Sequence, residues 1–588
     1  LNSTLIIVAC FLPLFFLSGM EGRMLIPLGI AFIVALFAST VVALTLTPVL
    51  CSYMLTTKKA LKKNEKEPFV SRTLKVWYKK ALEWALRHKK VVIGTSAALL
   101  IFTIIIMTGL GRSFLPPFNE GSLTINISTM PGISLEESDN MGRMAEKILL
   151  DIPEIQTVAR KTGRAELDEH ALGVNVSEME APFELDERSR DEFLADVRQR
   201  LGELKGVNIE IGQPISHRID AMLSGTKANI AIKLFGNDLN KLYNIGGQIK
   251  EAIQGIDGIA DLTLEQQIER PQLQIKPKRD MLAKYGIPLP EFSEFINVAL
   301  SGKVVSQVYE GGKVFDLTVK VHDDDKANME QIGNLMIDAN GQKVPLHYVA
   351  EILPLVGPNT ISRENVQRKI VVSANVAGRD LNGVVKDIQK TVGEQITLPE
   401  GYHVEYGGQF ESEQAASRTL FLTSVISILL IFLLLFNEFH SMPLSSIIML
   451  NLPLAIIGGI LSIWFTSGII SIPAIIGFIS LFGIATRNGI LLVSHYNHLR
   501  SEGMSLHDSV VLGSLDRLNP ILMTALTSAL ALIPLAVGGD LPGNEIQSPM
   551  AQVILGGLLS STLLNGFVVP IMYLLLNHKQ KEIENLEM

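Results

Sequence analysis

The sequence predicts an α-helical transmembrane bundle combined with a large α+β module that lies outside the membrane. Three observations predict this class. The 588 residues are 47% apolar and only 19% charged, and their mean hydropathy is +0.31. Eight apolar segments are long enough, or nearly long enough, for the roughly 20 residues that a membrane helix needs. Between the third and fourth segments lie 305 residues, 113–417, with the composition of a soluble domain.

The apolar segments define the predicted membrane helices. They are 4–20, 24–55, 91–110, 420–436, 444–465, 470–493, 520–537 and 550–576. Segment 24–55 is longer than one span, so its ends must leave the bilayer. We therefore assign two helices to 1–55, one to 91–111 and five to 418–577.

Charge predicts the orientation, because short cytoplasmic loops retain Lys and Arg. The link 56–90 holds 12 Lys and Arg against 3 acids, so it is expected in the cytoplasm. One crossing then places 113–417 outside, and its 31 Lys and Arg against 46 Asp and Glu agree with that side. Five further crossings return the tail 578–588 to the cytoplasm.

The basic link contains a predicted amphipathic helix. Apolar residues recur there at helical spacing, opposite a row of Lys and Arg: Val70, Leu74, Trp77, Ala81 and Ala85. This pattern is typical of a helix in the headgroup region of a bilayer. A solvated basic linker is the alternative.

The two ends of the chain contain a repeat. Pro13, Pro27, Ser39-Thr40 and Pro48 match Pro534, Pro549, Ser561-Thr562 and Pro570 at intervals of 14, 12, 8 and 15, 12, 8. Transporters are often built from such repeated halves. We therefore expect 1–55 to be the last two helices of a first repeat. We also expect the chain to be a fragment that lacks its N-terminal part.

Within the external module, strand-like and helix-like stretches alternate in the ferredoxin-like order β-α-β-β-α-β. One such subdomain is predicted over 112–226, where Ser134 and Glu137 have the spacing of a helix cap. A second is predicted over 227–301 and 359–417. A strand-rich insertion, 302–358, interrupts it, with turns at Gly311-Gly312 and Asn340-Gly341.

Several motifs resemble the resistance-nodulation-division (RND) efflux pumps, and within them the heavy-metal branch of cobalt-zinc-cadmium and copper-silver exporters. The matching stretches are Lys161 to Glu166, Ser216 to Asp220, Ile361 to Asn365, Val376 to Asp380, Tyr406 to Glu411 and Pro520 to Thr524. The resemblance covers essentially the whole chain.

The resemblance implies an RND permease fold in the bacterial inner membrane, with the module 112–417 as a periplasmic porter domain. It implies a secondary transporter rather than an enzyme, which needs no cofactor and exchanges protons for a divalent or monovalent heavy-metal ion. It further implies a homotrimer, and an insertion 302–358 that docks a periplasmic adaptor (membrane fusion protein) and an outer-membrane channel. The acids that carry protons in such pumps are expected upstream of Leu1.

Arg487 is the one clear ionisable residue inside an apolar segment, where a charge costs roughly 2.5 to 3.5 kcal/mol even on lenient scales. No Asp or Glu falls inside these segments. We expect Arg487 to pair with a carboxylate on another helix, in a switch that protonation of the acid would open. Asn488 and Thr524 could orient this pair. Alternatively, Arg487 snorkels to the headgroups, and the two polar residues are packing contacts.

Two sets of candidate metal ligands lie in the external module. Copper(I) and silver prefer thioethers, whereas zinc and cobalt prefer imidazole and carboxylate. The three-methionine cluster of copper-silver pumps falls on Asn126, near Glu178 and on Ala221, so it is not reproduced. Met179 and Met222 lie one residue away, although methionine is a common core residue. The harder set is Glu178, Glu180, His217 and Asp220, whose acids could equally form a solvated face.

Other functions receive less support from the sequence. No HExxH, paired CxxC, GxSxG or P-loop spacing is present, which disfavours a hydrolase or an ATP-driven pump. The net charge of −8 argues against a nucleic-acid partner, and Cys10 and Cys51 form no disulfide framework. Two alternatives stay open. They are an exporter of amphiphilic drugs, which the 6% aromatic content disfavours, and a receptor or protein-export accessory built on the same fold.

Overall fold

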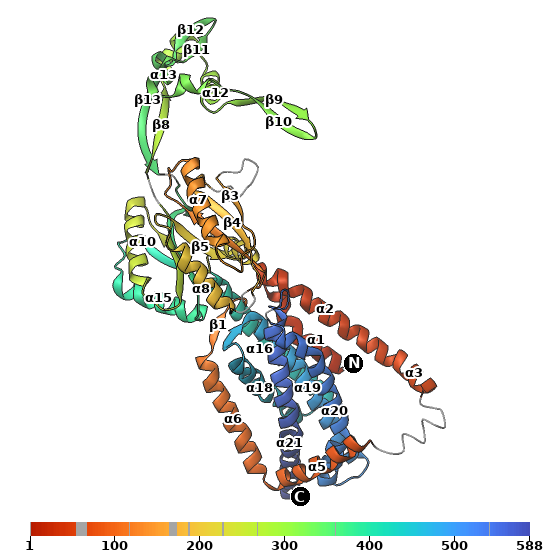
Figure 1. The fold of residues 1–588 in the computed structure, drawn as a ribbon. Coiled ribbons are helices and arrows are strands. Elements are labelled where there is room, and N and C mark those ends of the chain that lie inside the picture. Colours follow the sequence, from red (N-terminus) through yellow and green to blue (C-terminus); the bar gives the residue numbers. More distant parts are fainter. Residues whose placement is uncertain are drawn as a thin grey trace. The chain divides into compact units, whose positions relative to one another are not determined.

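The computed structural model describes residues 2–54, 68–116, 118–163, 173–185, 188–225, 228–266, 269–358, 360–539 and 541–587. The chain divides into two compact units. The main unit comprises Leu1–Thr129, Ser134–Glu265 and Arg363–Met588. The insertion unit comprises Met130–Ile133 and Gln266–Ser362. The apolar helices and the two largest sheets belong to the main unit (Figure 1).

Seven helical stretches in the described part of the chain are long and apolar enough to cross a membrane. They are α2 and α3 (Gly19–Leu44, Leu46–Met54), α6 (Lys89–Gly109), α16 (Gln409–Phe439), α17 and α18 (Met442–Met449, Asn451–Phe465), α19 (Ile472–Ser501), α20 (Leu506–Val537) and α21 (Gln547–Glu587). The predicted segment 4–20 differs. It forms the short helix α1 (Asn2–Phe11) and the 3-10 helix η1 (Leu12–Phe16), because Pro13 lacks the amide hydrogen needed to continue α1.

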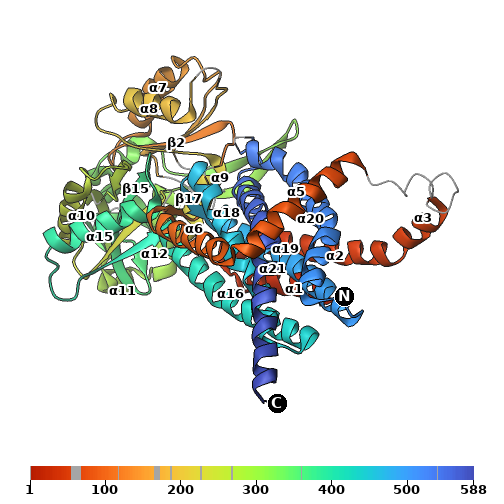
Figure 2. The same cartoon turned by 90° about the horizontal axis from the view of Figure 1, so that it is seen from below.

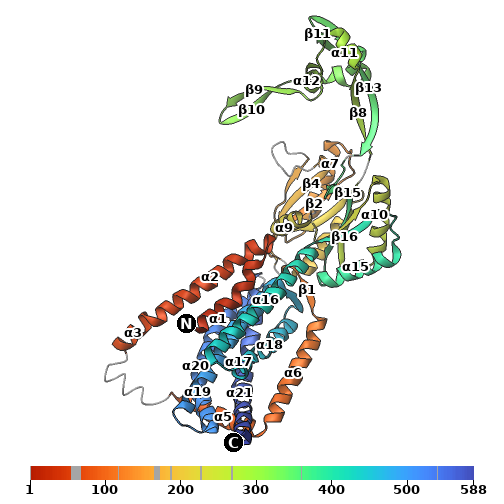
Figure 3. The same ribbon diagram turned by 180° about the vertical axis from the view of Figure 1, so that it is seen from behind.

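The centre of the bundle consists of α18, α19 and α21 (Figure 2). Two glycines allow α18 and α21 to touch through their backbones. A Cβ atom at Gly458 would lie 2.0 Å from the carbonyl oxygen of Gly556. Helix α16 packs against α1 and η1 at the side of this core (Figure 3). Small residues at helix contacts are the usual basis of packing in membranes.

The basic link forms the predicted helix α5 (Phe69–Arg87). A face other than the predicted apolar row packs against the bundle. Tyr78, Leu82, Ala85 and Leu86 face the bundle, and the Tyr78 hydroxyl donates a hydrogen bond of 2.6 Å to the carbonyl of Gly566. Of the predicted apolar row, only Ala85 is buried, while Val70, Leu74, Ala81 and Trp77 stay exposed. Most of the predicted row thus stays free of the bundle, where a headgroup contact remains open to it.

The first subdomain follows the predicted order. Its elements are β2 (Ser122–Ser128), α7 (Leu135–Leu150), β3 (Ala159–Thr162), β4 (Val176–Pro182), α8 (Arg190–Leu201) and β5 (Asn208–Gly212). They form an antiparallel sheet in the order β3-β4-β2-β5. The Ser134 hydroxyl accepts the Glu137 amide at 3.2 Å, which confirms the predicted cap of α7. Helices α7 and α8 cover one sheet face. A helix that was not predicted, α9 (Pro214–Ser224), contacts β2.

The second subdomain repeats this arrangement. It contains β6 (Ile230–Phe235), α10 (Leu239–Ile253), β7 (Ile259–Leu264), β15 (Gln367–Val376), α15 (Leu381–Gln395) and β16 (His403–Gly408). Its strands lie in the order β7-β15-β6-β16, and the short β14 (Arg363–Glu364) also pairs with β15. Helix α16 starts at Gln409, directly after β16, and continues into the bundle. One helix therefore connects this sheet to the membrane part.

The insertion unit is larger than predicted, because it begins at Gln266 rather than at Gly302. Residues 272–275, within the range 227–301 predicted for the second subdomain, belong instead to β8 (Glu269–Pro277), which pairs with β13 (Ala350–Pro358). The local pattern of a strand does not specify its partner, so the boundary was misplaced. The unit also contains α11 (Arg279–Tyr285), α12 (Leu289–Leu300), η2 (Asp323–Lys326), α13 (Met329–Asn334) and α14 (Leu346–Val349).

Two hairpins in this unit confirm the predicted turns. Strands β9 (Lys303–Glu310) and β10 (Lys313–Val319) are joined by Gly311-Gly312, and β11 (Met336–Ala339) and β12 (Gln342–Pro345) by Asn340-Gly341. All four turn residues have positive φ, as two-residue hairpin loops require. Every residue of β9 and β10 is exposed, including Tyr309 and Phe315.

Candidate functional site

A cavity of about 990 Å³, here called the cleft, opens between the two subdomains of the main unit. Its wall includes residues of α8 and α9 from the first subdomain, and of β15, α15 and the start of α16 from the second. The short strands β1 (Gly111–Ser113) and β17 (Ile469–Ser471), which pair in parallel, contribute the side next to the apolar helices. Among the described residues of this wall, Phe118 is the one Phe, Tyr or Trp. The cleft is therefore mainly lined by polar and aliphatic groups.

Helix α9 presents two predicted ligands to the cleft. Pro214 occupies its first turn, where a missing amide hydrogen does no harm, and Gly225 ends it in the left-handed conformation with φ 74. Both carboxylate oxygens of Glu120 accept the amide of Ile215 at 2.9 Å and so satisfy an open donor of the first turn. His217 and Asp220 are three residues apart, which places them on one helix face. Both are buried and both line the cleft.

The imidazole of His217 is held between α9 and the sheet. The Asn126 side-chain amide donates to its Nδ1 across 3.2 Å. The other edge of the ring lies against Gly212, where a Cβ atom would be only 2.3 Å from Nε2. Glycine at this position thus makes room for the ring. A metal ion on Nδ1 would have to displace the Asn126 amide.

Asp220 is held by amides of the second subdomain. Asn229 Nδ2 donates to one carboxylate oxygen at 3.1 Å, and Gln409 Nε2 donates to the other at 2.7 Å. Burial raises the pKa of Asp220 from 3.8 to about 6, although these two hydrogen bonds oppose the rise. The carboxylate is therefore poised between its protonated and charged forms near neutral pH. A cation in the cleft would compete both with a proton and with two amides for the same oxygens.

The predicted ligands on β4 point to two different faces of the sheet. Side chains alternate along a strand, so Glu178 and Glu180 share one face and Met179 takes the other. Met179 is fully buried in the core under α7 and α8, where no cleft cation could reach its sulfur. Glu178 lies directly opposite Asn126 across the sheet, and Lys161 Nζ lies 2.7 Å from its carboxylate. Glu178 and Glu180 therefore share a sheet face with Asn126, which donates to His217.

The structure brings together only part of the predicted ligand set. In the described residues, no group of three or more His, Cys, Asp and Glu side chains is arranged to hold a metal ion. Met222 is 63% exposed on α9, unlike the buried His217 and Asp220. Two of the predicted ligands, His217 and Asp220, thus lie together in the cleft wall. Glu178 lies next to Asn126, which binds His217. The two methionines do not converge on this pair.

The predicted coupling residues lie on two helices of the bundle. Arg487 is half-buried on α19, and no carboxylate of the described residues lies within 4.0 Å of its guanidinium. Asn488 is buried, and its Nδ2 has no hydrogen-bond partner among the described groups. Thr524 on α20 donates to the carbonyl of Pro520 in its own helix at 2.8 Å. In the part of the chain that the structure describes, no hydrogen bond or ion pair joins these three side chains.

Two functional side chains were missed by the sequence analysis. Asn229 and Gln409 bind Asp220, yet they lie 9 and 189 positions from it. Gln409 is part of the stretch Tyr406 to Glu411, but the stretch alone does not indicate that Asp220 is its partner. A buried carboxylate needs hydrogen-bond donors, so a buried Asp220 implies that amide or other donor groups lie beside it.

Comparison with known proteins identifies the family. The family model described as "AcrB/AcrD/AcrF family" matches residues 1–577. The chain belongs to this family. The cobalt-zinc-cadmium resistance protein CzcA of Cupriavidus metallidurans is 33% identical over 594 residues, which cover 99% of this chain and 55% of CzcA. The nickel and cobalt resistance protein CnrA of the same organism is 30% identical over 96% of this chain and 53% of CnrA.

Two further comparisons agree with these. The cation efflux system protein CusA of Escherichia coli is 27% identical, over 98% of this chain and 56% of CusA. A crystal structure of a heavy metal efflux pump superposes with a TM-score of 0.80 at 27% identity, covering 98% of this chain and 58% of that one. The RND permease fold is thereby confirmed. The chain spans about half the length of the curated relatives that it matches.

Proposed function

We propose that this chain forms part of an inner-membrane permease that exports heavy-metal cations in exchange for protons. The observation that carries the proposal is the pair His217 and Asp220, which lie on one face of α9 in the wall of a large cleft. Imidazole and carboxylate are the ligands that zinc, cobalt and nickel share. The family relatives named above are resistance and efflux proteins for such ions.

The cleft lies between two ferredoxin-like porter subdomains on the periplasmic side, and the tail of α21 lies in the cytoplasm. The basic α5 supports this orientation, since cytoplasmic segments keep their Lys and Arg. Exposed Trp77 and Phe69 beside those charges suit a helix in the headgroup region.

The complete protein works as a homotrimer with a periplasmic adaptor and an outer-membrane channel. The insertion unit supports such partners. Its β9–β10 hairpin exposes aliphatic and aromatic side chains along both strands, among them Val308, Tyr309 and Phe315. Exposed apolar groups of this extent mark interaction surfaces.

Arg487 couples transport to protons by pairing with a carboxylate that the described residues do not supply. An unpaired guanidinium inside a membrane is costly, and the described part of the chain has no acid within 4.0 Å of it. Protonation of the partner acid would break the pair and shift α19. Asn488, next in sequence and buried with an open Nδ2, would help to orient the pair, whereas Thr524 is occupied within its own helix.

A transport assay tests the proposal. The complete protein is reconstituted in vesicles with an imposed proton gradient, and uptake of zinc, cobalt, nickel, copper and silver is compared. The proposal predicts that His217→Ala and Asp220→Asn each abolish metal transport. Asp191→Asn, at an exposed position of the cleft wall, should leave it intact. Transport of lipophilic dyes without any metal transport would instead support the drug-exporter alternative.

A further inference from the structure

Helix α5 lies beside the membrane helices α20 and α21 and is bound to both (Figure 2). The Tyr78 hydroxyl donates to the carbonyl of Gly566 on α21 at 2.6 Å. The Asn519 side-chain amide of α20 donates to the Ser71 hydroxyl at 2.6 Å. Only His88 separates α5 from the apolar helix α6. These contacts fix α5 at the boundary of the apolar region, and they fix which of its faces point away from the bundle.

Beside the face that packs on the bundle, α5 carries an exposed apolar row. Its residues recur every three or four positions, which places them on one helix face. They are Val70, Leu74, Trp77, Ala81 and Trp84. All five are exposed, and Trp77 is 74% exposed. Tryptophan is enriched where the headgroups of a bilayer meet its apolar core, so this face is suited to lipid.

A basic row occupies the remaining face of α5. The helix holds five Lys and Arg against one Glu. Seven residues make about two turns, so Arg72 lies in line with Lys79, and Lys80 in line with Arg87. All four side chains are exposed. No carboxylate of the described residues lies within 4.0 Å of any of them. The row is therefore accessible to an external anion.

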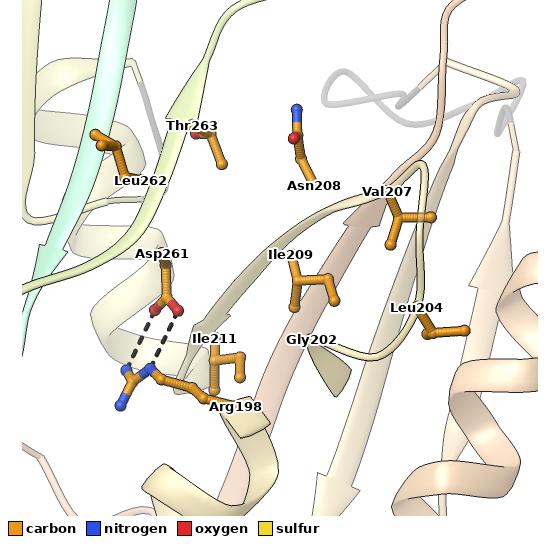
Figure 4. A pocket seen from close by; sticks show the side chains of 10 residues that line it. All are labelled: Arg198, Gly202, Leu204, Val207, Asn208, Ile209, Ile211, Asp261, Leu262 and Thr263. Carbon is orange, nitrogen blue, oxygen red and sulfur yellow. Dashed lines mark hydrogen bonds and ion pairs between the residues drawn. The ribbon is translucent and has the colours of Figure 1, made fainter. Parts of the chain in front are cut away.

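A paired arginine of the first subdomain shows the contrast. Arg198 lines a pocket of about 240 Å³ between β5 and β7, where Asp261 binds it through two hydrogen bonds (Figure 4). They run from Nε to Oδ1 at 3.1 Å and from Nη2 to Oδ2 at 3.2 Å. A guanidinium held in this way has its anion within the protein. Among the described residues, Arg72 of α5 has no such carboxylate.

We infer that α5 is a binding site for anionic phospholipids. The apolar row enters the acyl region, and the basic row binds the charged headgroups beside it. Basic residues next to apolar ones at a membrane surface attract anionic lipids, whereas a zwitterionic lipid offers no net charge. A headgroup position alone needs only the apolar row, so the basic row adds the preference. An acidic protein would match the charges alone, whereas an anionic lipid matches both rows.

Quenching of tryptophan fluorescence by brominated lipids tests the inference. Every tryptophan of the complete protein outside α5, Trp464 among them, is changed to Phe, so that Trp77 and Trp84 report alone. The protein is reconstituted in phosphatidylcholine vesicles with a small share of brominated lipid, either phosphatidylglycerol or phosphatidylcholine. We expect the brominated phosphatidylglycerol to quench at least about twofold more strongly, because its charge gathers it at the basic row. High salt is expected to reduce this preference, since it screens exposed charges.

Matched variants complete the test. One variant removes the four charges of the basic row: Arg72→Gln, Lys79→Gln, Lys80→Gln and Arg87→Gln. It is expected to be quenched about equally by both lipids. Its quenching by brominated phosphatidylcholine should stay unchanged, which would show that α5 is still folded at the membrane. The control removes four exposed charges of the two subdomains: Lys205→Gln, Lys241→Gln, Lys386→Gln and Lys390→Gln.

The control is expected to keep the full preference for the anionic lipid. Equal quenching by both lipids in the protein with its basic row intact would overturn the inference. A preference that persists unchanged without the four charges would overturn it as well. The site is independent of the metal cargo, so these values decide about α5 even if the protein moves no metal.

Discussion

The protonation of Asp220 is the most quantitative consequence of the cleft geometry. Burial raises its pKa from 3.8 to about 6, and at 1.36 kcal/mol per pKa unit this corresponds to roughly 3 kcal/mol. Between these two pH values the folded state binds more protons than the unfolded chain. The free energy of unfolding therefore falls as the pH rises through this window. The charged carboxylate destabilises the fold above pH 6 and has no such effect once both states are protonated, below about pH 4.

Infrared spectroscopy can follow this titration directly. The C=O stretch of a protonated carboxyl is recorded for the metal-free complete protein, and the spectrum of Asp220→Asn is subtracted. The difference band is expected to vanish with a midpoint near pH 6. Gln409→Leu removes a donor that favours the charged form, so it is expected to raise the midpoint by about one pH unit. Asp191→Asn, at an exposed position of the same cleft, is the control and should leave the band unchanged. A midpoint near 4, or no shift with Gln409→Leu, would refute the reasoning.

Three further changes have expected outcomes. Arg487→Gln is expected to lower proton-coupled metal transport at least about tenfold, while Arg500→Gln at the helix end leaves it unchanged, as vesicle uptake can show. Gly458→Val pushes α18 away from α21 and is expected to lower the free energy of unfolding by about 1 to 3 kcal/mol, which a lower melting temperature would report. Gly94→Ala, at a position with open space around it, is expected to leave the melting temperature unchanged. Ser189→Ala removes the capping box of α8 and should cost about 1 kcal/mol, which faster hydrogen exchange in the first turn of α8 would report.

The membrane part was largely predictable because its signal is local. Length and hydropathy of a segment are enough to indicate a spanning helix, and seven of the eight predicted segments form helices of that kind. The exception, 4–20, forms the shorter α1 and η1, since Pro13 ends α1 early. The order of strands and helices in both subdomains was also predictable from alternation and capping residues such as Ser134.

The site depended on contacts that no local pattern contains. The carboxylate of Asp220 accepts a hydrogen bond from Gln409, which follows β16 far along the chain. Met179 was a candidate ligand by its position in the sequence, but strand alternation turns it into the core. The insertion boundary failed for the same reason, since β8 pairs with a strand some 80 positions later. These errors concern which partner a residue finds, whereas α9, which carries His217 and Asp220, was not predicted as a helix at all.

The position of a bound metal tests the central claim most directly. The complete protein is loaded with zinc, and anomalous diffraction is combined with X-ray absorption spectroscopy. The account predicts a peak in the cleft, with an imidazole nitrogen of His217 and a carboxylate oxygen of Asp220 about 2.0 to 2.2 Å from the metal. It also predicts that Asn229 and Gln409 no longer bind Asp220. A metal bound elsewhere, with both amides still on that carboxylate, would contradict the account.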